Sequence, residues 1–253
     1  MNNKILLNPM KYKIDGDNLQ MVTLQLGPQD EVYGEAGSMK YMSGNIEMET
    51  KGKGGFMKGV KRKLSGESYF LTHFKTKSGN GLVGFAGNTP GKIKALDLSS
   101  GKNYIAQQDA FLCAEESVDL DIAFQKKLGA GFFGGEGFIL QKLSGNGKAF
   151  IHITGDMMTK NLKEGQILKV STGNVAAFED TVDYDIQRTG GVKSSLLSGE
   201  GIFMTTLRGP GKVWLQSMTL RDLAAELGKY VSGGGESSGS TIGDLADLAG
   251  DLS

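Results

Sequence analysis

The sequence predicts an all-β fold of three tandem units, followed by a short C-terminal helix. The main observation is an eight-residue block with a central Gly-Glu pair, which occurs three times, at residues 64–71, 133–140 and 197–204. The glutamates of these pairs are 69 residues apart (136 − 67) and then 64 apart (200 − 136), which identifies an internal repeat. The composition is a second observation, because 39 glycines and only 4 prolines without a Gly-X-Y period indicate many tight turns between short strands.

Each unit also contains a segment in which apolar and acidic residues alternate. The three copies are residues 46–50, 118–122 and 182–186. In the second copy Val118, Leu120 and Ile122 fall on one face, and the aspartates between them fall on the other. Alternation with a period of two is typical of a strand with one buried face, so we expect one such strand in every unit.

These repeats divide the chain into an N-terminal strand region, three β units, a helix and a flexible tail. The expected boundaries are 1–17, 18–87, 88–154, 155–218, 219–231 and 232–253. Because the same order of segments returns three times, we expect sandwich-like units related by an internal pseudo-threefold axis around a shared core.

Turn signals separate the strands that we expect within each unit. Residues 19–26 alternate and are followed by Gly27-Pro28, which predicts a strand that ends in a turn. Each Gly-Glu strand is followed by a glycine-containing turn and a returning strand, which predicts a hairpin at the end of each unit. These turns lie at residues 78–81, 144–147 and 208–211.

Helical signals occur only near the C-terminus. Thr219 lies three residues before Asp222, in a start that resembles a capping box, and the apolar residues from Leu220 onward have helical spacing. Gly228 offers a stop for this helix. The Gly/Ser-rich residues 232–240 predict a flexible linker and tail.

Charge and cysteine content exclude several classes of protein. The 28 basic and 28 acidic residues argue against a dedicated nucleic-acid-binding protein, so we expect no nucleic-acid partner. Cys113 is the only cysteine, and its apolar neighbours in the sequence favour a core position. No run approaches the roughly 18 apolar residues of a membrane span, and the N-terminus is unlike a signal peptide. We therefore expect no membrane span and a cytoplasmic protein.

No pattern of catalytic residues stands out, so we expect that the protein is not an enzyme and uses no cofactor. The GxGxxG match at residues 129–134 leads into a Gly-Glu strand, whereas a dinucleotide-binding loop leads into a helix. His73 and His152 are the only histidines, and they do not occupy equivalent positions in the repeats. We interpret them as hydrogen-bonded strand residues and not as metal ligands.

Two sets of repeated acidic residues are candidate sites. The glutamates of the Gly-Glu pairs could converge on a cation, although we favour bonds from backbone N–H groups at the glycine turns. These glutamates are Glu67, Glu136 and Glu200. The acidic residues of the alternating segments could bind Ca²⁺, although we favour a solvated face paired with nearby basic residues. These residues are Glu47, Glu49, Asp119, Asp121, Asp183 and Asp185.

Blocks of glycine followed by Leu-Ser-Gly-Glu carry a resemblance to a known family. Gly54-Gly55-Phe56 through Tyr69, and Gly190-Gly191-Val192 through Ile202, resemble the altered inheritance of mitochondria protein twenty-four family, over about residues 10–225. The resemblance implies a fold like that of the tryptophan RNA-binding attenuation protein, with three short double-stranded β-helix units per chain and three chains in a ring. Mitochondrial members are linked to inner-membrane organisation. The resemblance supplies no catalytic residues, and the fold alone does not imply RNA binding.

These expectations combine into a hypothesis about function. Tandem β units present edge strands, and an exposed edge is either protected or paired with another chain. We therefore expect a non-catalytic oligomeric scaffold or binding protein that forms a homotrimer and could hold a protein partner. The alternative is a module that binds a small ligand or carbohydrate in a pocket between β units.

Overall fold

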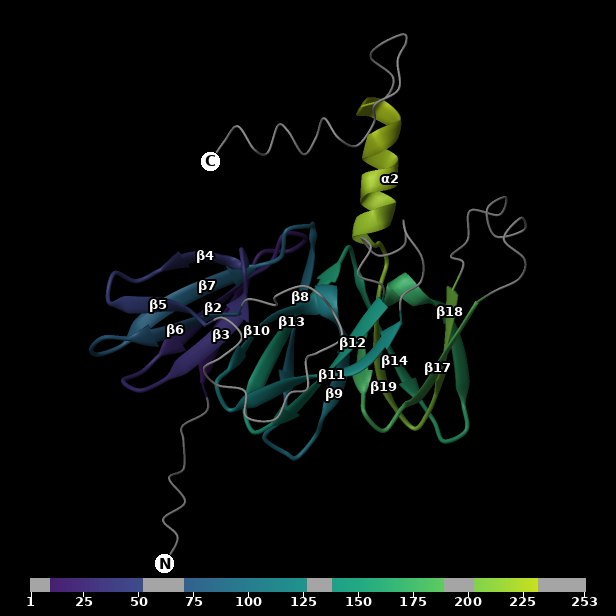
Figure 1. Ribbon diagram of the computed structural model, residues 1–253, viewed down its shortest axis with the longest axis horizontal. Helices are drawn as coiled ribbons and strands as arrows, with labels where there is room; N and C mark the ends of the chain where they lie inside the picture. Colours follow the sequence, from purple (N-terminus) through teal and green to yellow (C-terminus); the bar gives the residue numbers. More distant parts are fainter. Residues whose placement is uncertain (1–9, 52–70, 127–137, 189–202, 232–253) are drawn as a thin grey trace, which may run out of the picture. The chain divides into compact units, whose positions relative to one another are not determined.

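The computed structural model describes residues 10–51, 71–126, 138–188 and 203–231 (Figure 1). The chain divides into two compact units, residues 1–218 and 219–253, which are described separately. In its described part, the first unit is all-β and holds the strands β1 to β19 with two short 3₁₀ turns, η1 (Gln108–Ala110) and η3 (Thr172–Asn174). The all-β prediction is therefore confirmed.

The strands form four antiparallel sheets, which we name A to D. Sheet A has the order β1 (Lys11–Asp15), β2 (Met21–Leu26), β7 (Gly81–Ala86) and β4 (Met39–Met42). Sheet B has the order β5 (Ile46–Lys51), β6 (Leu71–Thr76), β3 (Glu31–Glu35), β10 (Phe111–Glu115), β13 (Lys148–Thr154) and β8 (Gly91–Asp97). Sheet C has the order β11 (Val118–Lys126), β12 (Phe138–Gly145), β9 (Tyr104–Gln107), β16 (Val175–Glu179), β19 (Gly211–Gln216) and β14 (Met157–Leu162). Sheet D has the order β15 (Ile167–Ser171), β18 (Phe203–Arg208) and β17 (Asp183–Arg188).

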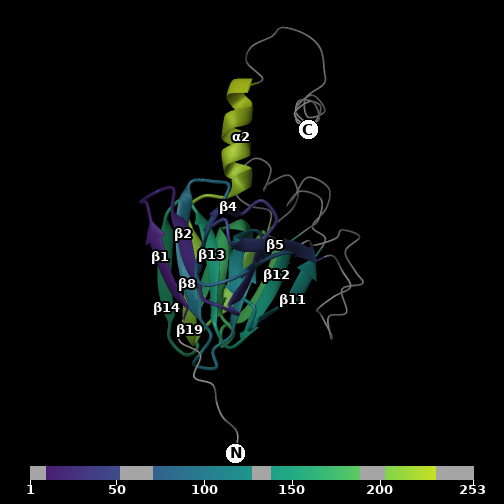
Figure 2. The same ribbon diagram turned by 90° about the vertical axis from the view of Figure 1, so that its left-hand side faces the viewer.

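Three buried apolar clusters separate the four sheets, so the sheets are stacked in the order A, B, C, D. The first cluster joins Leu24 of sheet A to Phe74 of sheet B. The second joins Phe111 of sheet B to Trp214 of sheet C. The third joins Ile105 of sheet C to sheet D. In Figure 1 the layers follow one another from the purple sheet to the green one, and Figure 2 looks at them from the purple side.

Strands in the middle of the stack bury both of their faces. In β9, Ile105 packs into the third cluster, whereas Ala106 on the opposite face packs into the second. In β3, Val32 packs into the first cluster and Tyr33 into the second. Because both faces of such a strand are buried, its sequence is not expected to alternate between apolar and polar residues.

Four strand pairings recur in the same order along the chain. The first pairing occurs three times, as β2–β7, β8–β13 and β14–β19, and the second occurs as β3–β6, β9–β12 and β15–β18. The third pairing occurs as β4–β7, β10–β13 and β16–β19, and the fourth as β5–β6, β11–β12 and β17–β18. All of these pairs are antiparallel. Two further pairs, β3–β10 and β9–β16, connect one set of strands to the next. We call these two connecting pairs the first seam and the second seam.

The predicted hairpins after the Gly-Glu strands are wrong. Strands β6 and β7 are consecutive, but β6 lies in sheet B and β7 in sheet A, and the pairs β12/β13 and β18/β19 also lie in different sheets. The turn residues do reverse the chain direction. However, β6 and β7 each pair with two other strands, so the turn carries the chain from one sheet to the facing one.

The predicted burial of Ile122 is also wrong. Val118 and Leu120 are buried as expected, whereas Ile122 is exposed. The pairing of β11 with β12 is regular from Val118 to Ile122 and shifts between Ile122 and Phe124. Ile122 is therefore the last residue before a β-bulge, which the alternation of the sequence does not reveal.

Two other local predictions agree with the structure. The predicted strand after residue 18 is β2, in which Val22, Leu24 and Leu26 are fully buried. Cys113 is fully buried in the first cluster, and burial raises the pKa of its thiol well above the ordinary value. The thiol is therefore part of the core and is kept protonated.

The second unit contains the predicted helix, α2 (Leu220–Val231). The capping box forms in both directions, since Thr219 N donates to Asp222 Oδ2 at 2.9 Å and Asp222 N donates to Thr219 Oγ1 at 3.0 Å. The helix continues past Gly228 to Val231, so this glycine does not end it, and the expected bounds 219–231 agree closely with the helix. Among the described helices, α2 included, we find none with the length and apolar character needed to cross a membrane.

Candidate functional site

The two outer sheets each present an edge that corresponds to a paired strand elsewhere in the stack. Strand β4 has the same pairing with β7 as β10 has with β13, and β10 pairs in addition with β3. Strand β15 has the same pairing with β18 as β9 has with β12, and β9 pairs in addition with β16. Among the described strands, β4 and β15 each have only one neighbour.

Apolar side chains are exposed along these two edges. Tyr41 is 40% exposed in β4, and Ile167 is 48% exposed in β15. The ring of Tyr41 covers Gly84, which faces it across the β4–β7 pair. Its hydroxyl is hydrogen-bonded to Thr23 Oγ1 at 2.6 Å, which fixes the ring at the edge of the sheet.

The two seams within the chain have the same geometry. In the first seam Tyr33 faces Ala114, and Glu116 N donates to Glu31 O at 3.0 Å. In the second seam Ile105 faces Phe178, and the corresponding bond runs from Asp180 N to Asn103 O at 3.2 Å. Because the residue pairing and the backbone hydrogen bond match, equivalent positions in the two seams can be assigned from the structure alone.

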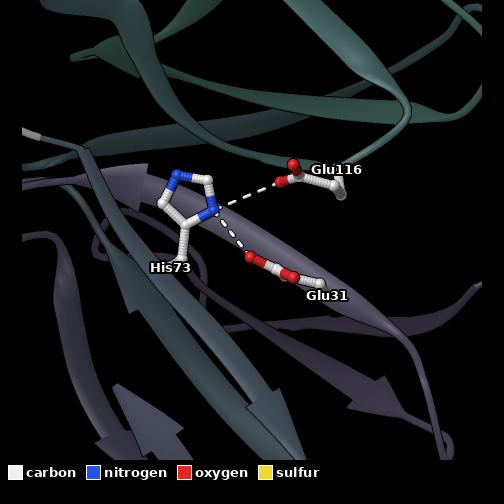
Figure 3. Close-up of side chains that lie close together, drawn as sticks. All are labelled: Glu31, His73 and Glu116. Atoms are coloured by element: carbon white, nitrogen blue, oxygen red, sulfur yellow. Dashed lines mark hydrogen bonds and ion pairs between the residues drawn. The ribbon is translucent and has the colours of Figure 1, made fainter. Parts of the chain in front are cut away.

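Three titratable side chains lie close together at the first seam (Figure 3). Glu31 is the first residue of β3, His73 lies in β6, and Glu116 directly follows β10. His73 faces Tyr33 in the β3–β6 pair, and Glu31 lies two residues before Tyr33 on the same face of the sheet. The rings of His73 and Tyr33 lie 5.6 Å apart between centroids, and Tyr33 Oη donates to Val118 O at 2.8 Å. The imidazole is therefore held against a fixed aromatic ring.

One nitrogen of His73 lies close to both carboxylates. Nδ1 is 2.8 Å from Glu31 Oε1 and 3.2 Å from Glu116 Oε2. The side chains of Glu31, His73 and Glu116 are 23%, 11% and 26% exposed. Glu116 Oε2 is itself buried, and it accepts no hydrogen bond from the described residues, although it lies within ion-pair distance of Nδ1. Because Nδ1 carries at most one hydrogen, it cannot satisfy both carboxylates well.

The second seam carries different residues at the same three positions. Asn103 replaces Glu31, Lys142 replaces His73, and Asp180 replaces Glu116. Asn103 Nδ2 donates to Asp180 Oδ2 at 2.9 Å, and Lys142 Nζ lies 3.4 Å from the same oxygen. A single carboxylate thus meets an amide donor and a permanent cation, whereas the first seam has two carboxylates around one imidazole.

The structure places only part of the acidic residues that the sequence singled out. Glu67, Glu136 and Glu200 lie outside the described residues. Asp119, Asp121, Asp183 and Asp185 are exposed on β11 and β17. Glu47 and Glu49 form ion pairs with Lys77 at 3.5 Å and with Lys75 at 3.9 Å. Within the described part of the chain, none of these residues belongs to a group of three possible metal ligands.

The two histidines have different surroundings. His152 is buried beside Gly87 and Gly91, whose missing side chains leave room for the ring. Burial lowers the pKa of His152, and a backbone hydrogen bond with Thr89 opposes this shift in part. His152 is therefore a buried, neutral strand residue, whereas His73 is the centre of a cluster that the sequence did not predict.

Glu31 was missed because its equivalent at the second seam is Asn103, so a search for repeated acidic residues passes over it. Glu116 has an acidic equivalent, Asp180, but neither residue belongs to the alternating segments or the Gly-Glu pairs. The three members also lie 42 and 43 residues apart in the chain (73 − 31 and 116 − 73). Only the register of β3, β6 and β10 brings them together.

The stacked antiparallel sheets define an all-β protein in which each of the two inner sheets contains one seam. The family model for mitochondrial biogenesis AIM24 matches residues 12–218. The chain belongs to this family, as its glycine-rich blocks suggested.

Two relatives from Streptococcus pyogenes support the same conclusion. The uncharacterized protein M6_Spy0233 of serotype M6 is 32% identical over 237 residues, which cover 90% of this chain and 94% of that protein. The crystal structure of protein SPYM3_0169 superimposes with a TM-score of 0.73 at 29% identity, and the match covers 87% of this chain and 99% of the other. The similarity therefore extends over most of the chain.

Proposed function

We propose that the protein is a non-catalytic scaffold whose chains join head to tail into a closed homotrimeric ring. In this proposal residues 18–87, 88–154 and 155–218 are three copies of one β unit. The observation that supports it is the pair of edge strands β4 and β15, because their equivalents elsewhere in the stack are paired on both sides.

A contact between β15 of one chain and β4 of the next would join sheet D to sheet A as one seven-stranded sheet. Its order would be β17-β18-β15-β4-β7-β2-β1, and the first six of these strands correspond one by one to the strands of sheets B and C. Such a contact uses different surfaces on the two partners, so it closes only as a ring or continues as a fibre. The family resemblance favours a ring of three chains, similar to the tryptophan RNA-binding attenuation protein.

The two internal seams predict the register of this third seam. Tyr41 pairs with Gly84 between β4 and β7, and Ala177 pairs with Trp214 between the equivalent strands β16 and β19. Tyr41 is therefore the equivalent of Ala177. Ala177 faces Ala106, and the equivalent of Ala106 in β15 is Val170. The proposed register therefore sets Tyr41 opposite Val170, and Met42 opposite Lys169.

A charge-reversal series tests the proposed contact. We expect the wild-type chain to have about three times its monomer mass of 26.9 kDa in light scattering. Met42→Lys sets two like charges opposite each other, which destabilises a strand pair, so it shifts the protein towards monomers. Lys169→Glu added to Met42→Lys restores the opposite charges and the assembly.

Met42→Glu is the matched control, because it introduces a charge of the sign that Lys169 attracts. It should retain more assembly than Met42→Lys at equal protein concentration. A monomeric wild-type protein, or equal assembly of the two Met42 variants, would contradict the proposal. The expectation of a cytoplasmic location stays a prediction that rests on the sequence alone.

A further inference from the structure

We infer that Glu31, His73 and Glu116 form a binding site for a divalent transition-metal cation such as Zn²⁺ at the first seam. The ligand atoms are His73 Nδ1, Glu31 Oε1 and Glu116 Oε2, which all lie within 4.8 Å of one another. Figure 3 shows one oxygen of each carboxylate beside the same imidazole nitrogen.

The distances between these atoms suit a shared ion. Ligand atoms about 2.1 Å from one metal, at angles of 90° to 109°, lie about 3.0 to 3.4 Å from each other. The measured separations from Nδ1 are 2.8 Å and 3.2 Å. Both distances from Nδ1 therefore lie close to the range for a shared ion, and the two carboxylate oxygens lie within 4.8 Å of each other.

The charge balance also favours a cation. Two carboxylates lie around one imidazole, and Glu116 Oε2 is buried without a hydrogen bond from the described residues. A buried anionic oxygen without a partner is destabilising. A proton on the imidazole would balance one of the two negative charges, whereas a divalent ion would balance both.

The second seam provides an internal comparison. There Lys142 supplies a permanent positive charge to Asp180, and Asn103 adds a neutral donor. The first seam has one more carboxylate and no lysine or arginine at these three positions. A bound cation at His73 would therefore balance the carboxylate charge at the first seam, as the Lys142 ammonium balances that of Asp180 at the second.

The ligand set indicates the kind of metal. An imidazole nitrogen with two carboxylates suits Zn²⁺ and similar first-row ions, whereas Ca²⁺ and Mg²⁺ prefer oxygen ligands alone. The partial exposure of both glutamates leaves room for water at the remaining positions. Because the ligands come from β3, β6 and the residue after β10, the ion would connect both sides of the first seam.

Titration of the full chain with Zn²⁺ tests the site. We expect one equivalent per chain in competition with a chromophoric chelator, and a rise of the melting temperature with Zn²⁺ concentration. Glu116→Gln keeps the size of the side chain but removes a charged ligand, so it should weaken binding by at least about tenfold. Asp180→Asn is the matched control at the second seam, and it should bind Zn²⁺ as the wild type does.

Binding of Co²⁺ supplies a readout that does not depend on the variants. The wild-type protein should give visible d–d absorption, and X-ray absorption should show one imidazole with oxygen ligands around the metal. Equal Zn²⁺ affinity of the wild type and Glu116→Gln, or a metal without an imidazole ligand, would overturn the inference. Since the site lies within one chain, it should also bind Zn²⁺ in the monomeric Met42→Lys variant, which separates this test from that of the ring.

Discussion

The contact between Tyr41 and Gly84 allows a quantitative test of how edge strand β4 is held. Adding a Cβ atom at Gly84 would place it 2.1 Å from Tyr41 Cε1, with two more ring atoms within 2.8 Å. Gly84 does not have a positive φ, so Gly84→Ala changes the space and not the backbone. The ring of Tyr41 must therefore move away from the sheet.

The expected loss of stability follows from the interactions that the ring gives up. Its hydrogen bond to Thr23 contributes about 0.5–1.5 kcal/mol, and its cross-strand packing contributes about 0.2–1 kcal/mol. Replacing glycine lowers the entropy of the unfolded chain, which returns about 0.4–1 kcal/mol. We expect Gly84→Ala to reduce the free energy of unfolding by about 1 kcal/mol.

Urea unfolding of a double-mutant cycle isolates this effect. In the Tyr41→Ala background no ring is present, so Gly84→Ala should be neutral or slightly stabilising. The difference between the two backgrounds measures the coupling between these positions. The reasoning is refuted if Gly84→Ala lowers stability equally in both backgrounds at the same protein concentration.

Two further predictions concern a buried histidine and a helix cap. Because burial lowers the pKa of His152 in the folded protein, the unfolded chain binds a proton more readily, and stability should fall as pH drops below about 6.5. His152→Gln should reduce the slope of melting temperature against pH between 6.5 and 5, and an unchanged slope would contradict this account. Thr219→Ala removes the hydroxyl that accepts from Asp222 N, so α2 should lose about 1 kcal/mol of stability. Faster amide exchange over Leu220–Val231 would reveal this loss, and unchanged exchange would exclude a role for the cap.

Features set by neighbouring residues could be predicted from the sequence. Strand β2 alternates because one of its faces meets the core, and α2 begins at Thr219 because the side chains of the capping box lie within three residues of each other. The family could also be identified, because its glycine-rich blocks are local patterns. Each of these features depends on a short segment of chain.

Features that depend on distant strands could not be predicted. The turn after β6 reverses the chain, but only the partners of β6 and β7 decide that the two strands lie in different sheets. The bulge between Ile122 and Phe124 likewise arises from the pairing of β11 with β12. His73 looked like an ordinary strand residue, because its two carboxylate neighbours come from β3 and from the end of β10.

Cross-linking in the proposed register tests the ring most directly. The only native thiol, Cys113, is buried, so Met42→Cys together with Lys169→Cys, two exposed positions that the proposed register sets opposite each other, adds the only exposed pair of thiols in the described part of the chain. With a short thiol-bridging reagent we expect covalent dimers and trimers and no larger species, whereas either single variant gives none. Products that remain monomeric, or a ladder that continues beyond three chains, would contradict a closed ring built from β4 and β15.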